Sequence, residues 1–182
     1  MTQTKNDSDI VYHNIITRTS VRSYQDKPVE DSKIEKLLRA GMAVPSAVNI
    51  QPWHFIVVKN KATLEKIAEI TPNAGMAKEA PLAIVVCGDM RNESNDLVRE
   101  FWVQDASAAT QNILLAAHAM ELGAVWTGTY PAQNRCEAIS QLLNLPSSII
   151  QFSTIVIGYP KETQQPKDKW KEENISYEVF GE

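Results

Sequence analysis

The stretch between residues 44 and 55 concentrates the side chains that could bind a small polar molecule. Pro45 and Pro52 fix the backbone and remove two donors, so the connection is predicted to be stiff. Between them lie three neutral hydrogen-bonding side chains: Ser46, Asn49 and Gln51. Rigidly held neutral groups beside aromatic residues suit a flat heterocycle that is half apolar and half hydrogen-bonding. The alternative is an ordinary turn anchored by a buried Trp53.

A second segment, residues 18–24, adds positive charge. Arg18 and Arg22 stand four residues apart, with Thr19, Ser20 and Ser23 close by. Guanidinium groups bind phosphate oxygens in a bidentate way, and hydroxyls add further hydrogen bonds. The alternative is a solvated basic edge that follows the first helix. Together the two segments offer a clamp for a phosphate and a clamp for a ring edge, and a flavin mononucleotide requires both.

The order and spacing of these motifs resemble the nitroreductase-like flavoproteins. The family typically carries Arg-x-Ser-x-Arg/Lys, which matches residues 18–22, and then Pro-Ser-x-x-Asn-x-Gln-Pro-Trp, which matches residues 45–53. The resemblance extends from about Ile10 into the C-terminal tail. It implies a bound FMN, NADH or NADPH as the electron donor, and a homodimer that holds FMN at its subunit interface.

The resemblance assigns the first motif to the phosphate and the ring. Arg18, with Thr19 and Ser20 beside it, would bind the phosphate. Arg22 would lie near the pyrimidine edge of the ring, where negative charge develops on reduction, and a fixed cation there stabilises the reduced flavin. The alternative for each arginine is a surface ion pair.

Other matches to the family complete the expected site. The partner subunit would contribute Pro45, Ser46, Ala47 and Asn49, and Gln51 would lie on the same wall or bridge the interface. After the third strand, backbone amides at Thr127 and Gly128 would meet the ring, and glycine permits close approach. Lys167 and Lys169 would assist with the phosphate, and Asn73 is a looser match near the ribityl chain.

The implied activity is reduction of nitroaromatic, quinone or similar acceptors by NAD(P)H, with ping-pong kinetics because both substrates use one pocket. No catalytic residue is expected beyond Arg22, since no nucleophile and base form a recognisable pair. Neither is a metal expected, because His54 has no ligand partners at suitable spacing. The alternatives are a specialised dehalogenase or dehydrogenase of the same fold, a flavin-binding module without turnover, and a domain that binds no flavin. A lid insertion would favour a specialised enzyme, but residues 71–78 and 89–96 form only short connections.

Composition places the chain among globular proteins. Its 182 residues include 43% hydrophobic and 22% charged residues, and the net charge of −4 argues against nucleic acid as the main partner. The N-terminus lacks a signal-peptide core, and no run is long enough for a membrane span. Two cysteines do not form a disulfide framework, so Cys87 and Cys136 are expected as buried thiols. The cytoplasm is therefore the expected location.

Hydrophobic patterning predicts alternating elements within a single domain, residues 1–182. Helices are expected over residues 9–18, 31–41, 62–70, 95–122 and 135–143, and strands over residues 55–58, 81–87, 124–127 and 152–157. The alternation alone suggests a parallel doubly wound sheet. However, no Gly-x-Gly-x-x-Gly motif follows a strand, and the resemblance implies an α+β three-layer sandwich with a mixed, mainly antiparallel sheet. It also implies an intertwined dimer, in which residues 161–182 form an extension that packs on the partner.

Overall fold

The computed structural model describes residues 6–91 and 96–181. Its centre is a four-stranded sheet of β1 (Trp53–Val58), β2 (Leu82–Asp89), β3 (Gly123–Gly128) and β4 (Ile149–Gly158). The strand order is β1-β2-β4-β3, and every neighbouring pair is antiparallel. A single parallel bridge joins Ser20 to Ala124 at the β3 edge. The α+β expectation is confirmed, and the parallel arrangement suggested by alternation is wrong.

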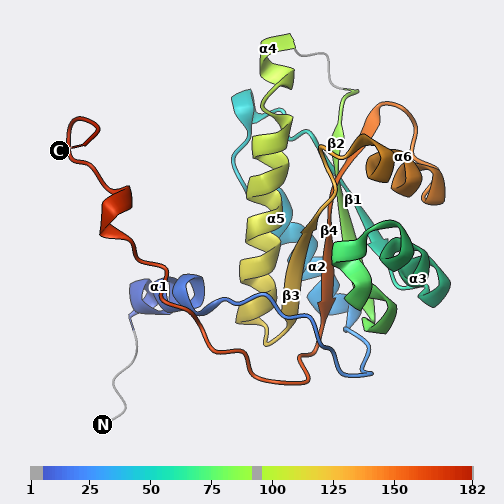
Figure 1. Cartoon of the computed structure of the whole chain (residues 1–182), viewed down its shortest axis with the longest axis horizontal. Coiled ribbons are helices and arrows are strands. Elements are labelled where there is room, and N and C mark those ends of the chain that lie inside the picture. The colour runs from blue at the N-terminus through green and yellow to red at the C-terminus, as the bar shows by residue number, and fades with distance from the viewer. Residues whose placement is uncertain (1–5, 92–95, 182) are drawn as a thin grey trace.

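Helices cover both faces of the sheet and form a three-layer sandwich (Figure 1). On one face, α2 (Asp31–Met42) and α5 (Trp102–Ala119) pack on Leu82, Ile84 and Val86. The intervening residues of β2 point to the other face, where they meet α3 (Lys61–Ile70), η2 (Pro72–Glu79) and α6 (Gln133–Leu142). Because both faces are covered, β2 is an almost continuous apolar run instead of an alternating one.

The structure corrects the longest predicted element. A helix over residues 95–122 was expected, but α4 (Asp96–Arg99) and α5 are separated by a turn at Glu100 and Phe101. Residue 95 lies outside the described residues. Helix α5 then ends at Ala119, because Glu121 adopts a left-handed conformation with φ of 60°. Cys87 and Cys136 are both buried and unpaired, as expected.

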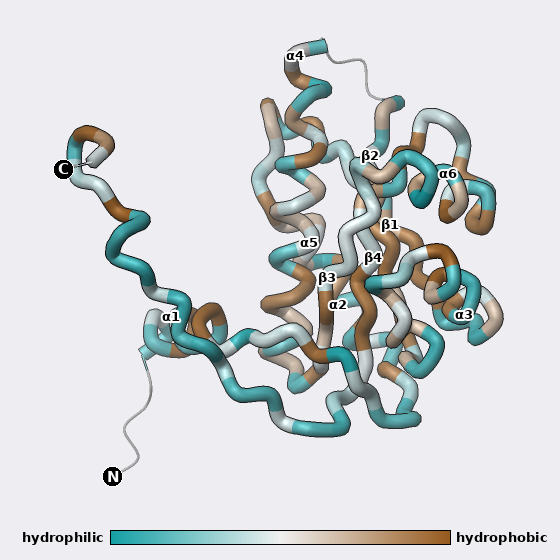
Figure 2. Tube along the Cα trace, viewed as in Figure 1, coloured by the Kyte–Doolittle hydropathy of each residue, from teal (hydrophilic) through white to brown (hydrophobic). Residues whose placement is uncertain are grey.

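Both ends of the chain leave the sandwich on the same side (Figure 1). Helix α1 (Asp7–Thr17) buries none of its residues, although apolar positions make up much of its sequence. The segment that follows β4 has one short helical turn, η3 (Glu172–Asn174), and is exposed almost throughout. Figure 2 shows apolar residues on α1 and near the end of this tail, well away from the apolar strands. None of the described helices combines the length and apolarity needed to cross a membrane.

A pair of glycines on β3 offers a test of how the edge strand is packed. A Cβ atom at Gly123 would lie 2.6 Å from Cγ1 of Val21, whereas at Gly128 it would meet nothing within 4 Å. We expect Gly123→Ala to lower the free energy of unfolding by about 1–3 kcal/mol through overpacking. Gly128→Ala, the matched control, should leave it unchanged or slightly higher. Urea titration measures both, and equal destabilisation would contradict the packing described here.

Candidate functional site

A basic pocket forms where the segment after α1 faces the C-terminal tail. It encloses about 270 Å³ and is lined by Arg18, Thr19, Ser20, Arg22, Gln164, Gln165, Lys167 and Lys169. The described lining therefore contains four cations and no carboxylate. None of the four forms an ion pair with a described carboxylate. Uncompensated cations beside hydroxyls and amides are the arrangement that a phosphate group requires.

The basic segment is held against the edge strand of the sheet. The Val21 amide donates to the Ala124 carbonyl at 3.1 Å. Three residues further on, the buried Tyr24 hydroxyl lies 2.6 Å from the Val21 carbonyl and 3.0 Å from that of Val156. Burial raises the pKa of Tyr24, so the hydroxyl remains a donor at every physiological pH. Val21 and Tyr24 are buried, whereas Arg22 between them is exposed and lines the pocket.

The C-terminal part of α5 holds α1, which ends directly before this segment. Asn14 Nδ2 donates to the Leu115 carbonyl at 3.1 Å, and His118 Nε2 lies 2.9 Å from Thr17 Oγ1. Thr17 Oγ1 donates to the His13 carbonyl at 2.6 Å, so His118 Nε2 acts as the donor of the second bond. Burial lowers the pKa of His118, and the nearby Arg18 charge lowers it further. These contacts fix the position of Arg18 at the C-terminal end of α5.

The second predicted segment, residues 45–52, adopts an unusual backbone. Val48, Asn49 and Gln51 have φ values of 42°, 58° and 56°. Such left-handed conformations cost on the order of 1–3 kcal/mol at a non-glycine residue, and a β-branched residue such as Val48 is rare there. Val48 is also 77% exposed, so packing does not offset its cost. Strain of this kind gathers at functional sites.

Local hydrogen bonds maintain this backbone. Ser46 Oγ accepts from the Gln51 amide at 2.8 Å, and the Ser46 carbonyl accepts from the Asn49 amide at 3.0 Å. Gln51 Nε2 donates to Asn49 Oδ1 at 3.3 Å. The Asn49 and Gln51 side chains are consequently paired with each other at the surface, and both remain exposed.

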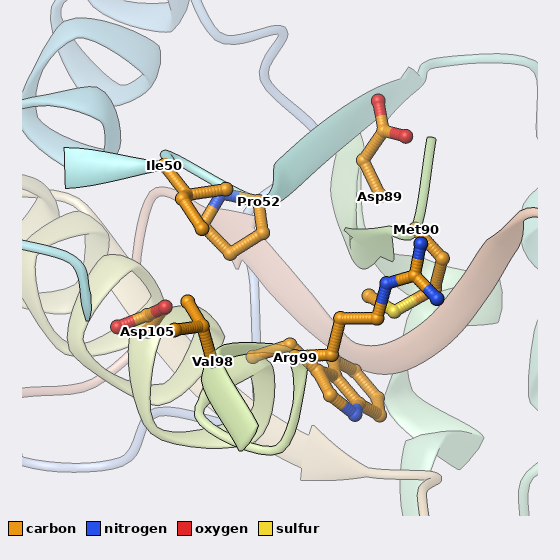
Figure 3. A pocket seen from close by; sticks show the side chains of 8 residues that line it. Ile50, Pro52, Asp89, Met90, Val98, Arg99 and Asp105 are labelled. Carbon is orange, nitrogen blue, oxygen red and sulfur yellow. The ribbon is translucent and has the colours of Figure 1, made fainter. Parts of the chain in front are cut away.

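A small pocket lies beneath this segment, against the start of α5 (Figure 3). Ile50 and Pro52 line it from above, and Val98, Arg99, Trp102 and Asp105 line it from the helices. Asp105 is a buried residue with a relative exposure of 7%, and its Oδ2 atom is buried as well. Its Oδ1 accepts the Ala47 amide at 3.2 Å, and burial raises its pKa. Asp105 thereby joins the strained segment to the core.

The structure does not bring the two predicted segments together within one chain. Residues 45–52 meet α5 at Asp105, whereas Asn14 and Thr17 of α1, just before the basic segment, meet it at Leu115 and His118. Thirteen residues of α-helix separate Asp105 from His118, which corresponds to about 20 Å at 1.5 Å per residue. Figure 1 shows the two segments at opposite ends of the helix.

The remaining predicted residues lie in different surroundings. Thr127 is buried, and its hydroxyl donates to the Thr154 carbonyl at 2.7 Å, which leaves only its backbone for a ligand. Gly128 is exposed at the end of edge strand β3, where a Cβ atom would meet nothing. No steric contact within the described chain therefore requires glycine at position 128. Asn73 is exposed in η2 and does not line the basic pocket.

Sequence reasoning did not single out three features of this surface. Gln164 and Gln165 line the basic pocket, and only their place before Pro166 could have suggested it. Asp105 lies within the helix expected over residues 95–122, and a carboxylate on the buried face of a helix is a signal that it needs a partner. The exposed apolar side chains of α1 were missed as well: Ile10, Val11, Tyr12, Ile15 and Ile16.

Comparison with known proteins gives the geometry a context. The profile of the Nitroreductase family matches residues 15–73 and 70–159. This chain belongs to the nitroreductase family. A Methanothermobacter thermautotrophicus protein, provisionally named NADH dehydrogenase/NAD(P)H nitroreductase, is 49% identical over 93% of this chain and 87% of its own length.

Solved structures of nitroreductase-family proteins have the same fold. A Parabacteroides distasonis protein with the same provisional name is 45% identical, has a TM-score of 0.88, and is matched over 94% of this chain and 99% of its own. An FMN-dependent nitroreductase from Clostridium difficile is 30% identical with a TM-score of 0.84, over 93% of this chain and 99% of its own. The nitroreductase-like fold expected from the sequence motifs is confirmed.

Proposed function

We propose that this chain is an FMN-dependent NAD(P)H oxidoreductase that reduces nitroaromatic, quinone or similar acceptors. The observation that carries the proposal is the basic pocket, in which Arg18, Arg22, Lys167 and Lys169 stand without carboxylate partners among the described residues. Support comes from the relatives, since one at 30% identity is named an FMN-dependent nitroreductase and others are named for NADH or NAD(P)H.

The residues present fit FMN at both of its ends. Arg18, Thr19 and Ser20 would hold the phosphate, with Lys167 and Lys169 contributing charge from the tail. The exposed end of β3 at Gly128 leaves room for a ring to approach the backbone. The strained segment then offers neutral polar groups, from Ser46 to Gln51, to the edge of the ring.

A site of this kind requires two copies of the chain. Within one chain about 20 Å of α5 separates the basic segment from residues 45–52, and the short ribityl chain of one FMN does not span that distance. We propose a homodimer in which Pro45, Ser46, Ala47 and Asn49 approach the flavin held by the partner, with Gln51 on the same wall. The exposed apolar face of α1 and the tail residues Trp170, Tyr177, Val179 and Phe180 would cover the partner.

The chemistry itself belongs to FMN, which supplies hydride transfer when it is bound. Arg22 provides a fixed cation beside the ring, which favours the reduced and more negative state. The nicotinamide nucleotide and the acceptor use the same open pocket in turn, which gives ping-pong kinetics. A non-catalytic flavin module and a specialised dehalogenase or dehydrogenase are the competing assignments, and the expected cytoplasmic location stays a prediction.

The first test concerns the reaction. We expect the purified protein to show flavin absorbance, to lose it on addition of NADH or NADPH without oxygen, and to regain it with a quinone. Steady-state plots at several acceptor concentrations should be parallel, as ping-pong kinetics require. A flavin that is retained but not bleached by either nucleotide would identify a binding module instead.

The second test separates the two arginines. Arg18→Ala should weaken FMN binding by about 1.5–3 kcal/mol, the value of a hydrogen bond to a charged group, yet leave riboflavin binding unchanged, because riboflavin has no phosphate. Arg22→Ala should lower the midpoint potential of the bound flavin and affect FMN affinity less. Flavin titration and spectroelectrochemistry measure these effects. Equal losses of FMN and riboflavin in Arg18→Ala would contradict the phosphate assignment.

The third test asks whether the site is shared between copies. Arg18→Ala and Asn49→Ala should each bind FMN poorly, but a heterodimer of the two would contain one intact site. Unfolding and refolding an equal mixture should restore about a quarter of the parent sites, the statistical share for a two-fold dimer. Each variant refolded alone is the control. No recovery in a mixture that forms dimers would place the whole site in one chain.

A further inference from the structure

Asp105 is a buried carboxylate without an evident role in α5 itself. It lies in the first turn of the helix, is 7% exposed, and has one described hydrogen-bond partner, the Ala47 amide. Its second oxygen, Oδ2, is buried with no partner among the described residues. A carboxylate near a helix N-terminus is favourable at the surface, but that explanation does not require burial. Burying a carboxylate costs free energy unless it is hydrogen-bonded, and the described bond is the one from the Ala47 amide.

The partner of Asp105 is the segment with the most strained backbone in the described chain. Its internal bonds, such as Ser46 Oγ with the Gln51 amide, hold residues 46–51 together as a unit but do not fix where the unit lies. Val44 and the buried Pro52 anchor its two ends. Between these ends the Ala47 backbone amide donates a hydrogen bond to Asp105 Oδ1, and this bond ties the segment to α5.

We propose that Asp105 is a positioning residue: by accepting the Ala47 amide it holds residues 46–51 in the strained conformation that presents Ser46, Asn49 and Gln51 to the flavin. The inference rests on the proposed function for the identity of the ligand. It adds a residue that touches neither FMN nor substrate. Figure 3 shows Asp105 on α5, across the pocket from the Ile50–Pro52 side.

The role requires an acceptor and not a charge. The Ala47 amide needs one oxygen facing it, and an amide oxygen in the same place serves equally. Burial raises the pKa of Asp105, and the bond from the Ala47 amide partly opposes that shift. Asp105→Asn therefore keeps the function of the side chain, whereas Asp105→Ala removes it.

The test compares Asp105→Ala, Asp105→Asn and the control Ser107→Ala. Ser107 lies on the same helix, and its hydroxyl bonds within the helix to the Val103 carbonyl at 2.7 Å. We expect Asp105→Ala to weaken FMN binding roughly three- to tenfold, the equivalent of one lost hydrogen bond, and to change the visible circular dichroism of the bound flavin. Asp105→Asn and Ser107→Ala should retain the parent spectrum.

A second variant removes the donor of the same bond. Ala47→Pro has no amide hydrogen, and proline is suited to the first position of a helical turn after an extended residue such as Ser46, with φ of −139° and ψ of 160°. It should reproduce the spectrum of Asp105→Ala. This variant decides the question if Asp105→Ala does not fold.

Amide hydrogen exchange in the flavin-free protein gives a readout that does not depend on the proposed function. Residues 46–51 should exchange faster in Asp105→Ala than in the parent, with no change in Ser107→Ala. If the parent binds no FMN, the proposed function fails while this comparison still stands. Parent-like exchange and flavin spectra in Asp105→Ala would overturn the inference, and so would an Asp105→Asn variant that behaves like Asp105→Ala.

Discussion

Helix α5 determines the geometry of this protein, because its length separates the two groups of residues that could bind one ligand. The strained segment contacts its first turn at Asp105, and Thr17, directly before the basic segment, contacts its last turn at His118. The helix is also packed closely, since a Cβ atom at Gly41 would lie 2.9 Å from Ile113 Cδ1. A helix packed in this way neither bends nor shortens. The two groups of residues can meet on one small molecule only if a second chain supplies one of them.

The exposed ends of the chain also favour association with a second copy. Five apolar residues of α1 and four of the tail are at least 49% exposed. The sandwich itself, in contrast, is packed on both faces of β2. An isolated monomer gains nothing from displaying these residues to water. Since the tail also carries Lys167 and Lys169 to the basic pocket, any surface that covers the tail would also order one side of that pocket.

Most of the sandwich follows from patterns that act locally. The apolar run of β2 and the face of α2 containing Ile34 and Leu37 were predictable, because burial on a regular element has a fixed period. Strand pairing was not, since alternating helices and strands suit parallel and antiparallel sheets alike, and only the motifs favoured the observed one. The break in the helix at Glu100 and Phe101 could not be predicted, because no glycine or proline marks it in the sequence.

The candidate site, like the sandwich, has parts that could be predicted from the sequence and parts that could not. The family resemblance assigned Arg18, Lys167 and Lys169 to one phosphate and Arg22 to the ring, and the structure gathers all four around one pocket. The conformation of Val48 could not be predicted, because local preference opposes it and only the surrounding bonds enforce it. A segment held in that state before a ligand arrives has already lost its conformational freedom. Binding of the proposed flat ligand to such a segment would not have to supply that ordering cost, so the preorganised backbone would favour it.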